Sequence, residues 1–341
     1  MNIREALDAL VNGRRDLTEA ETVGVMQEIM GGEATPPQVA GFLVALRMKG
    51  ETVDEVTGMA RVMREHSLHV EVEGPLLDTC GTGGDASGTI NVSTAAAFVA
   101  AGAGARVAKH GNRAMSSACG SADVLEALGA KIDLGPDQVA ECIRKSGFGF
   151  MFAQAFHPAM KHVAPVRREL GVRTVFNILG PLTNPAGAAS QVIGVPSSEL
   201  APLLAEALGR LGCTHALVVH GDGGVDELAL SGPSEVNELK DREVRSYFVS
   251  PPDFGLALAP PDAVRGGSAE ENAAMLRATL AGETGPKRDI VLLNAAAALV
   301  AGDIAQDLAE GVRRAGESID SGAARERLDA FVAVSNSFGQ A

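Results

Sequence analysis

The stretch PLLDTCGTGGDASGTINVSTAAAFVAAGAGARVAK, residues 75–109, carries the pattern that decides the fold. The apolar run Pro75–Cys80 is followed by a glycine-rich turn, a helix of small residues over Ala95–Ala103 and a second apolar run, Ala105–Lys109. Short apolar runs bounded by glycines are typical of buried strands. Strand, loop, helix and strand in this order predict an α/β layer with a largely parallel sheet.

The same alternation continues toward the C-terminus. A polar loop after Lys109 leads into a helix predicted from about Ser121 to Leu128. Further strands are predicted at Phe148–Phe152, Gln191–Val195 and His215–His220, and further helices near 198–210, 268–281, 288–301, 303–315 and 321–333. Glu235–Leu239 and Val244–Val249 flank Lys240-Asp241-Arg242, which predicts a hairpin beside the sheet. The larger α/β domain is expected to span residues 72–341.

Before residue 72 the pattern is helical throughout. Ile3, Ala6, Leu7 and Leu10 lie on one face of a helix, and later residues repeat this spacing. Thr52-Val53-Asp54-Glu55 fits a capping box at the start of a fourth helix. Four short amphipathic helices predict a small N-terminal bundle, residues 1–71, that is too thin to stand as a large domain.

Composition limits the classes of function. The chain has 341 residues with 29 Lys and Arg against 43 Asp and Glu, a formal charge of −14, and it has no Trp and a single Tyr. An acidic chain with few aromatic residues disfavours nucleic-acid binding, which needs a basic surface and stacking platforms. The four cysteines are far apart and no apolar run is long enough to span a bilayer. A cytoplasmic protein without membrane contact is expected.

The first candidate for a chemical role is the loop Gly81-Thr82-Gly83-Gly84-Asp85. It is followed by Asn91-Val92-Ser93-Thr94 at a predicted helix start. Glycines allow backbone N–H groups to turn toward a ligand, and a helix N-terminus adds a positive dipole end. The loop lacks the lysine of an ATP-binding loop and the G-x-G-x-x-G register of a dinucleotide site. It is either an anion cradle or a tight glycine-rich turn.

The second loop, residues 109–117, holds a lysine, a histidine, an asparagine, an arginine and two serines around Gly111. This density of hydrogen-bond donors is unusual for a structural turn, although a solvated polar loop remains the alternative. In an open α/β sheet, loops at the carboxyl ends of neighbouring strands face one crevice. The two loops together therefore predict a site for a strongly anionic ligand.

Two later segments add charged groups. Arg167, Arg168 and Arg173 follow His157-Pro158, and an arginine binds a carboxylate or phosphate through two hydrogen bonds. The alternative is that each of these arginines lies on a solvent-exposed helix face. Asp226 and Glu227 follow the strand that ends near His220, and adjacent carboxylates on a loop suit Mg²⁺. A solvated acidic turn is the alternative here.

These segments together resemble the anthranilate phosphoribosyltransferase family over nearly the whole chain. The likeness rests on GTGGD, NVST, KHGNRAMSS, GSADVLEALG, FHPAMKHVAPVRRELGVRTVFNILGPLTNP and GVDELALSGPSEV, in that order. The resemblance implies a small helical domain hinged to a larger α/β domain, with part of residues 160–185 returning to the helical part. It also implies a homodimer, Mg²⁺, and transfer of phosphoribosyl from 5-phosphoribosyl 1-diphosphate to anthranilate in tryptophan biosynthesis.

The resemblance assigns residues to four groups. The phosphoribosyl diphosphate site is expected to comprise Gly81, Gly84, Asp85, Thr89, Asn91, Val92, Ser93, Thr94, Lys109, His110, Gly111, Asn112, Arg113, Ala114, Met115, Ser116, Ser117 and Ser121. Anthranilate is expected at Gly81, Asn112, His157 and Arg167, the metal at Ser93, Asp226 and Glu227, and the catalytic role at Lys109, Asn112 and Arg167. Ala118-Cys119 departs from the polar residues that many members carry.

Two other functions share the same scaffold. A related pyrimidine nucleoside phosphorylase runs similar chemistry with inorganic phosphate, and KHGNRA and VRRELGVRT favour the anthranilate enzyme over it. A non-catalytic nucleic-acid-binding relative is disfavoured by the charge of −14 and by the Asp226-Glu227 pair.

Overall fold

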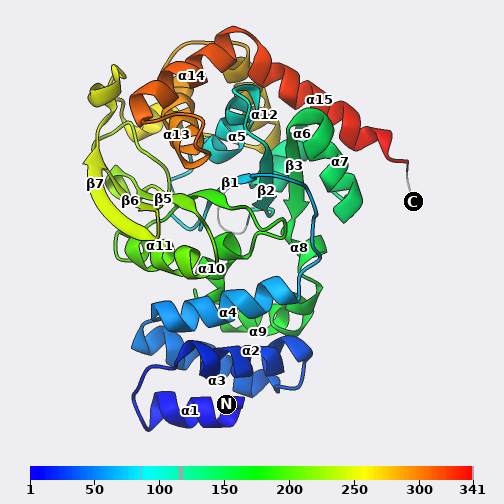
Figure 1. Cartoon of the computed structure of the whole chain (residues 1–341), viewed down its shortest axis with the longest axis vertical. Helices are drawn as coiled ribbons and strands as arrows, with labels where there is room; N and C mark the ends of the chain where they lie inside the picture. Colours follow the sequence, from blue (N-terminus) through cyan, green and yellow to red (C-terminus); the bar gives the residue numbers. More distant parts are fainter. Residues whose placement is uncertain (86, 115–117, 340–341) are drawn as a thin grey trace.

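The computed structural model describes residues 1–85, 87–114 and 118–339. Its described part has a helical bundle below an α/β domain (Figure 1). The helices are α1 (Ile3–Val11), α2 (Glu19–Gly31), α3 (Pro36–Lys49), α4 (Val53–Glu65), α5 (Val92–Gly102), α6 (Ser121–Ala127), α7 (Pro136–Ser146), α8 (Ala153–Phe156), α9 (Ala164–Leu170), α10 (Phe176–Leu179), α11 (Leu200–Arg210), α12 (Ala269–Leu280), α13 (Pro286–Ala301), α14 (Leu308–Asp320) and α15 (Ala323–Ser337). Short 3₁₀ turns are η1 (Pro158–His162), η2 (Gly180–Thr183), η3 (Asp222–Gly224), η4 (Pro251–Phe254) and η5 (Pro261–Val264).

The sheet has seven strands in the order β3-β2-β1-β4-β5-β6-β7 in the described part of the chain. The strands are β1 (Leu77–Gly81), β2 (Val107–Gly111), β3 (Phe148–Phe152), β4 (Ser190–Gly194), β5 (His215–His220), β6 (Ser234–Lys240) and β7 (Glu243–Val249). The first five pair in parallel, and β6 and β7 add an antiparallel hairpin at one edge. The predicted fold class, a helical bundle with a mostly parallel α/β sheet, is confirmed.

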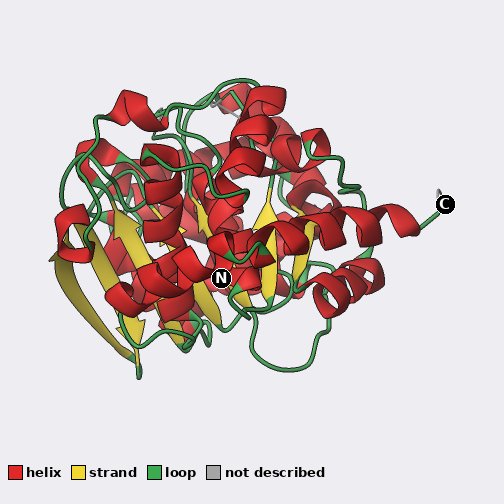
Figure 2. Cartoon of the chain, turned by 90° about the horizontal axis from the view of Figure 1, so that it is seen from above, coloured by secondary structure: helices red, strands yellow, loops and turns green. Residues whose placement is uncertain are grey.

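Helices cover both faces of this sheet, as the view from above shows (Figure 2). On β5, Leu217 and Val219 face the core that contains α5 and α13, whereas Ala216 and Val218 face the core that contains α11 and the bundle helices. The alternation follows from the two-residue period of a strand. A parallel sheet buried on both faces explains the continuous apolar runs in the sequence.

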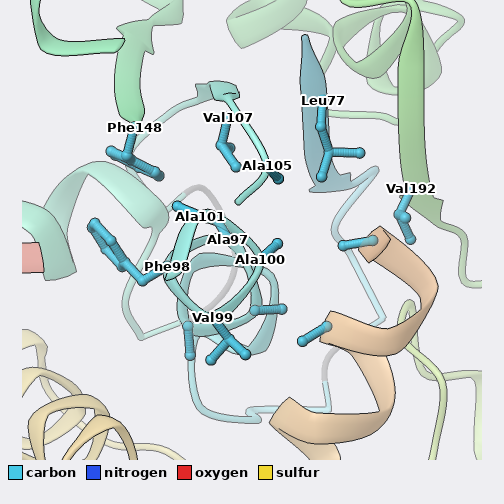
Figure 3. Packing of buried hydrophobic residues seen from close by; sticks show 14 of the residues in the cluster. Leu77, Ala97, Phe98, Val99, Ala100, Ala101, Ala105, Val107, Phe148 and Val192 are labelled. Carbon is cyan, nitrogen blue, oxygen red and sulfur yellow. The ribbon is translucent and has the colours of Figure 1, made fainter. Parts of the chain in front are cut away.

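Helix α5 lies at the centre of the larger core. Its residues from Ala95 to Ala101 are all buried, and α13, α14 and α15 pack around it. A helix that is apolar on every side has to be enclosed by other elements, and alanines allow that close approach. Phe98 stacks on Phe148 with ring centroids 4.3 Å apart, beside Val107 of β2 (Figure 3).

The bundle forms as its caps predict. Thr52 accepts the Glu55 N–H while the Glu55 side chain accepts the Thr52 N–H. Glu55 is fully buried and also receives the Leu17 N–H and the Lys49 ammonium, so one carboxylate ties α3 to α4. The later segment η1–α9 packs on α2 and α3, which brings residues of the 160s to the bundle.

Several helices differ from the sequence prediction, among them α14, α7 and the short helices α8, α9 and α10. The helix predicted at 303–315 begins only at Leu308, because Asp303 adopts a left-handed conformation (φ 53°) and Asp307 caps the helix by accepting the Glu310 N–H. Helix α7 was not predicted, although Pro136 in its first turn and Gly147 after its end are ordinary boundary signals. Among the described residues no helix combines the length and the hydrophobicity needed to cross a membrane.

Removing the Phe98 ring should unfold the α/β core more readily. We expect Phe98→Ala to lower the free energy of unfolding by about 3–5 kcal/mol, because the ring is fully buried and leaves a cavity between α5 and β3. Phe248→Ala on β7, where the side chain is 71% exposed, should change it by less than about 0.5 kcal/mol. Urea unfolding of both variants checks this, and equal losses would contradict the packing described.

Candidate active site

The acidic turn after β5 reaches the ends of two other strands. Asp226 Oδ2 accepts the Gly83 N–H at 2.9 Å, so the turn contacts the loop after β1. A β-carbon at Gly81 would overlap Asp226 Oδ2, and one at Gly194 would overlap the Asp226 carbonyl. Glycine at the facing ends of β1 and β4 therefore creates the space in which Asp226 lies.

Glu227 connects the same turn to the start of α5. Its Oε1 accepts the Ser93 N–H at 3.2 Å. Asn294 on α13 holds the next residue by pairing with both backbone groups of Leu228, at 2.9 and 3.0 Å. The two carboxylates thus diverge, one to the glycine loop and one to the helix start.

Lys109 is the buried cation beside these carboxylates. Its side chain is 1% exposed, and Nζ donates to Ser93 Oγ at 3.2 Å and to the Thr79 carbonyl. Burial lowers the pKa of Lys109, and Asp78, Cys80 and Glu227 oppose that shift. Asp78 is also buried and accepts the His110 N–H at 3.2 Å and the Asn184 Nδ2–H at 2.7 Å. The lysine is therefore held in place from β1 before any ligand binds.

The carboxylates outnumber the cations around this point. Burial, followed by the charge of Asp85, raises the pKa of Asp226 to about 7. Burial and then Asp226 raise the pKa of Glu227 well above its usual range. Asp85 Oδ2 is buried and has no hydrogen-bond partner among the described residues. Carboxylates crowded in this way lack a compensating positive charge, which is what a divalent cation supplies.

The donor set fits Mg²⁺ shared with a substrate. In the described part of the chain, no three Asp, Glu, His or Cys side chains are arranged to enclose a metal ion. Mg²⁺ is commonly held by one or two carboxylates while water and substrate phosphates fill its remaining positions. Asp226, Glu227 and Ser93, whose N–H donates to Glu227 and whose hydroxyl accepts from Lys109, are the residues here that would hold it.

The second loop is braced by α6. Asp123 accepts the N–H groups of Ala114 and Gly120, both at 2.9 Å, and Ser121 Oγ donates to the Asn112 carbonyl at 3.3 Å. The guanidinium of Arg113 pairs with Asp123 and Glu126, so it is directed at α6. Met115, Ser116 and Ser117, which were expected to bind the diphosphate sugar, lie outside the described residues.

Two buried histidines join this loop to the segment that leads to the bundle. His110 Nδ1 lies 3.2 Å from the Gly180 carbonyl, and His110 Nε2 lies 3.2 Å from His157 Nε2. A neutral His110 that donates from Nδ1 accepts the Nε2–H of His157, which satisfies both contacts. Burial is the main cause that lowers the pKa of His110 to about 3 and of His157 to about 4, so both rings are neutral near pH 7.

The arginine-containing segment lies between the bundle and the glycine loop. Arg167 on α9 is half-buried with its Cζ 5.5 Å from the Phe176 ring centroid, and burial lowers its pKa. Arg173 extends from the turn after α9, and its Nη1 occupies the space that a β-carbon of Gly84 would fill. Neither guanidinium has an ion-pair partner within residues 1–85, 87–114 and 118–339.

Comparison with known proteins assigns this arrangement to a family. Residues 4–67 match the model described as "Glycosyl transferase family, helical bundle domain", and residues 73–325 match "Glycosyl transferase family, a/b domain". Anthranilate phosphoribosyltransferase of Chloroflexus aggregans is 63% identical over 337 residues, 98% of this chain and 99% of that protein. The chain belongs to the anthranilate phosphoribosyltransferase family.

Solved structures agree with this membership. The crystal structure of anthranilate phosphoribosyltransferase from Thermus thermophilus superposes with a TM-score of 0.92 at 50% identity, covering 97% of this chain and 99% of that one. The Saccharomyces cerevisiae enzyme in complex with PRPP and Mg has a TM-score of 0.91 at 29% identity, with 98% of each chain covered. The family's fold therefore extends over both parts of this chain.

The structure brings together only part of the expected set. Gly81, Ser93, Lys109, Asp226 and Glu227 form one connected cluster with Asp85. The other expected residues that the structure describes contribute only backbone groups or lie at the edge of this cluster. Val92 and Thr94 are buried in the first turn of α5, Thr89 forms a bridge with Arg265, and Asn112 accepts from Gln154 Nε2 at 3.4 Å. Asn91 donates to the Cys119 carbonyl at 3.1 Å, and Gly111 lies against Ser121.

Several residues around the site were missed by sequence reasoning. Asp78 accepts hydrogen bonds from the His110 N–H and from Asn184, and Asn294 accepts the N–H of Leu228, next to Glu227. Asp123 fixes the second loop by accepting the Ala114 N–H. A signal existed for two of them, because Asp78 and Asn294 are polar residues inside apolar runs. Such residues need hydrogen-bond partners when buried, but the sequence does not say which partners they find.

The neutral histidine pair predicts a loss of stability in mild acid. Both pKa values in the folded chain lie below the ordinary value of about 6.5, so the unfolded chain binds more protons between about pH 6.5 and pH 4. Stability should therefore fall as pH falls through this range, by about 1.4 kcal/mol per pH unit for each histidine. Urea unfolding near pH 7 and near pH 5 should show a smaller loss in a His110→Gln/His157→Gln double variant. Substitution of the exposed His69 by Gln is the control, and a double variant as acid-sensitive as the unaltered chain would refute the assignment.

Proposed function

We propose that this chain transfers the 5-phosphoribosyl group of 5-phosphoribosyl 1-diphosphate to the amine of anthranilate in L-tryptophan biosynthesis, releasing pyrophosphate. The observation that carries the proposal is the connection of one acidic turn to both anion-binding elements, Asp226 to Gly83 and Glu227 to Ser93. A diphosphate sugar and a divalent cation together match the charges of that arrangement. The relatives and solved structures named above carry this activity in their names.

The diphosphate is expected against the glycine loop and the start of α5. Glycine backbone at Gly83 and Gly84 has positive φ, which turns successive N–H groups into an anion-binding concavity. The N-terminal end of α5 adds the positive end of its dipole. Lys109 lies behind Ser93 and contributes a fixed charge without needing to move.

Mg²⁺ is the cofactor in this proposal, and when bound it supplies positive charge that stabilises pyrophosphate as a leaving group. The residues that would hold it are Asp226, Glu227 and Ser93. Asn294 orients Glu227 by hydrogen-bonding to the neighbouring residue Leu228. The Gly83 N–H orients Asp226 by donating to its carboxylate. This support matters because a ligand that is already positioned loses little entropy on binding.

Anthranilate is expected on the side of α9, where Arg167 binds its carboxylate. Phe176 beside the guanidinium offers an apolar surface for the aromatic ring. The amine nitrogen then forms a bond to C1 of the ribose as the C1–O bond to pyrophosphate breaks, and the amine loses one proton. An aromatic amine is uncharged near pH 7, so its attack needs orientation more than a strong base.

The histidines are not suited to act as that base. His110 and His157 have pKa values of about 3 and about 4 because they are buried, so they accept a proton poorly near pH 7. Their hydrogen bonds instead fix the position of the second loop relative to Gly180. Asn112 and His157 are therefore proposed to position anthranilate, with the catalytic gain arising from orientation and leaving-group stabilisation.

The remaining expectations concern organisation. We propose a helical domain of residues 1–71 joined by part of 160–185, supported by the packing of α9 on α3. We also propose a homodimer, which rests on the family resemblance, and a cytoplasmic location, which rests on the composition of the sequence. Val11 and Met48, 58% and 84% exposed on α1 and α3, offer apolar surface for a second copy, and sedimentation velocity tests for the dimer.

The decisive assay follows the loss of anthranilate fluorescence on adding 5-phosphoribosyl 1-diphosphate and Mg²⁺. Substitution of Asp226→Asn together with Glu227→Gln should reduce this turnover by about a hundredfold or more, because the groups that hold the cation are neutralised. The variant should be at least as stable as the unaltered chain, since like charges are removed from a buried site. Asp222→Asn, an exposed position in the same turn, is the matched control. Full activity in the double variant would remove the metal assignment, and phosphorolysis of a pyrimidine nucleoside would favour the phosphorylase alternative.

Arg167→Ala should weaken anthranilate binding in particular. If the carboxylate pair forms in a desolvated site, its loss is worth about 2–5 kcal/mol. The apparent affinity for anthranilate, measured at saturating sugar diphosphate, should fall accordingly while the KM for the sugar diphosphate changes little. An unchanged affinity for anthranilate would reject this role for Arg167.

A further inference from the structure

Arg173 lies where the proposed diphosphate site meets the arginine-containing segment. It follows α9 by three residues, its side chain is exposed, and its Nη1 occupies the position of a β-carbon on Gly84. Gly84 has a φ of 82°, so both its backbone and its missing side chain suit this contact. A flexible arginine placed over the glycine loop is positioned to meet an anion that the loop binds.

The charges around Arg173 explain why such a contact is useful. Asp85, next to Gly84, has a buried oxygen without a partner among the described residues, and Asp226 and Glu227 lie beyond it with Lys109 as their neighbouring cation. A diphosphate entering this region meets predominantly negative groups. Within the part of the chain that the structure describes, the Arg173 side chain is exposed and lies against Gly84.

We propose that Arg173 binds the diphosphate of the sugar substrate, so that the bundle-side segment is held against the glycine loop. This inference rests on the proposed function and adds a binding residue to it. A guanidinium presents two parallel N–H groups that match phosphate oxygens. Arg173 supplies an exposed positive charge at the loop, whereas Lys109 is buried.

The position of Arg173 connects substrate binding to the arrangement of the helical part relative to the α/β part. Val166 and Val175, on either side of it, are buried in the core that also contains bundle residues such as Phe42 and Met59. The flanking helices α9 and α10 contact α3 and α4 of the helical part, whereas Gly84 follows β1 of the α/β part. A ligand held by both would favour the closed arrangement and exclude water from the sugar carbon.

The diphosphate is favoured over the carboxylate of anthranilate for a geometric reason. Arg173 lies on Gly84, beside the N–H groups of the anion-binding loop, whereas Arg167 lies beside Phe176. The two arginines therefore face different substrates. This distinction makes the proposal testable by comparing their variants.

The test measures the KM of each substrate and, separately, the binding of inorganic pyrophosphate with Mg²⁺ by calorimetry. Arg173→Ala should raise the KM for 5-phosphoribosyl 1-diphosphate and the Kd for pyrophosphate by about tenfold to a hundredfold, as expected for a lost hydrogen bond to a charged group. The KM for anthranilate should stay within about twofold. Arg173→Lys should recover part of the loss, because the charge remains and the planar fork does not.

Arg168→Ala is the matched control, because Arg168 is an exposed arginine in the same segment. It should leave all three constants unchanged, and equal thermal midpoints would show that each variant folds. A rise in the KM for anthranilate alone in Arg173→Ala would overturn the proposal in favour of the carboxylate, and three unchanged constants would reject any role. Absence of anthranilate consumption in the unaltered chain would instead refute the proposed function, while the pyrophosphate measurement would still decide whether Arg173 binds the anion.

Discussion

The structure depends on one electrostatic constraint, the crowding of carboxylates around a single buried ammonium group. Asp78 and Glu227 lie near Lys109, Asp226 lies beside Asp85 and Glu227, and each raised carboxyl pKa has burial as its first cause. A buried charge is tolerated only when neighbouring groups pair with it or hydrogen-bond to it. The hydrogen bonds come from the Thr79 carbonyl on β1, Gly83 in the loop after β1, Ser93 at the start of α5 and Asn184 after η2.

Backbone packing makes this crowding possible. Asp226 fits between β1 and β4 because Gly81 and Gly194 are register partners without side chains. The small residues of α5 allow α13 to approach closely enough for Asn294 to reach Leu228. A larger residue at any of these positions would move a carboxylate rather than merely fill space. The glycines and alanines that mark the sequence between residues 75 and 109 therefore position charged groups as well as the chain.

The sequence allowed the fold to be predicted in most of its elements because the signals there are local. The strands at 148–152 and 215–220 have the predicted bounds, and the hairpin turn at Asp241-Arg242 has positive φ at both residues, as a tight hairpin requires. The prediction failed at 303–315 because a left-handed residue and a cap delay the helix. Motif spacing pointed to loops that the structure brings into contact, but the contacts of Asp78, Asn294 and Arg173 join residues far apart in the chain. No periodicity encodes such pairs, so they had to come from the structure.

The contacts made by residues 157–180 suggest why the family combines a helical bundle with an α/β sheet. This one segment touches the second loop through His157 and Gly180, touches the glycine loop through Arg173, and is packed on the bundle through α9. His110 and His157 bond to each other as neutral groups, so this link does not depend on ionisation near pH 7. Arg173, in contrast, is a surface charge whose interaction with an anion depends on whether the anion is present. The histidine link at the second loop is therefore permanent, whereas the contact of Arg173 with the glycine loop would be strengthened when the diphosphate binds.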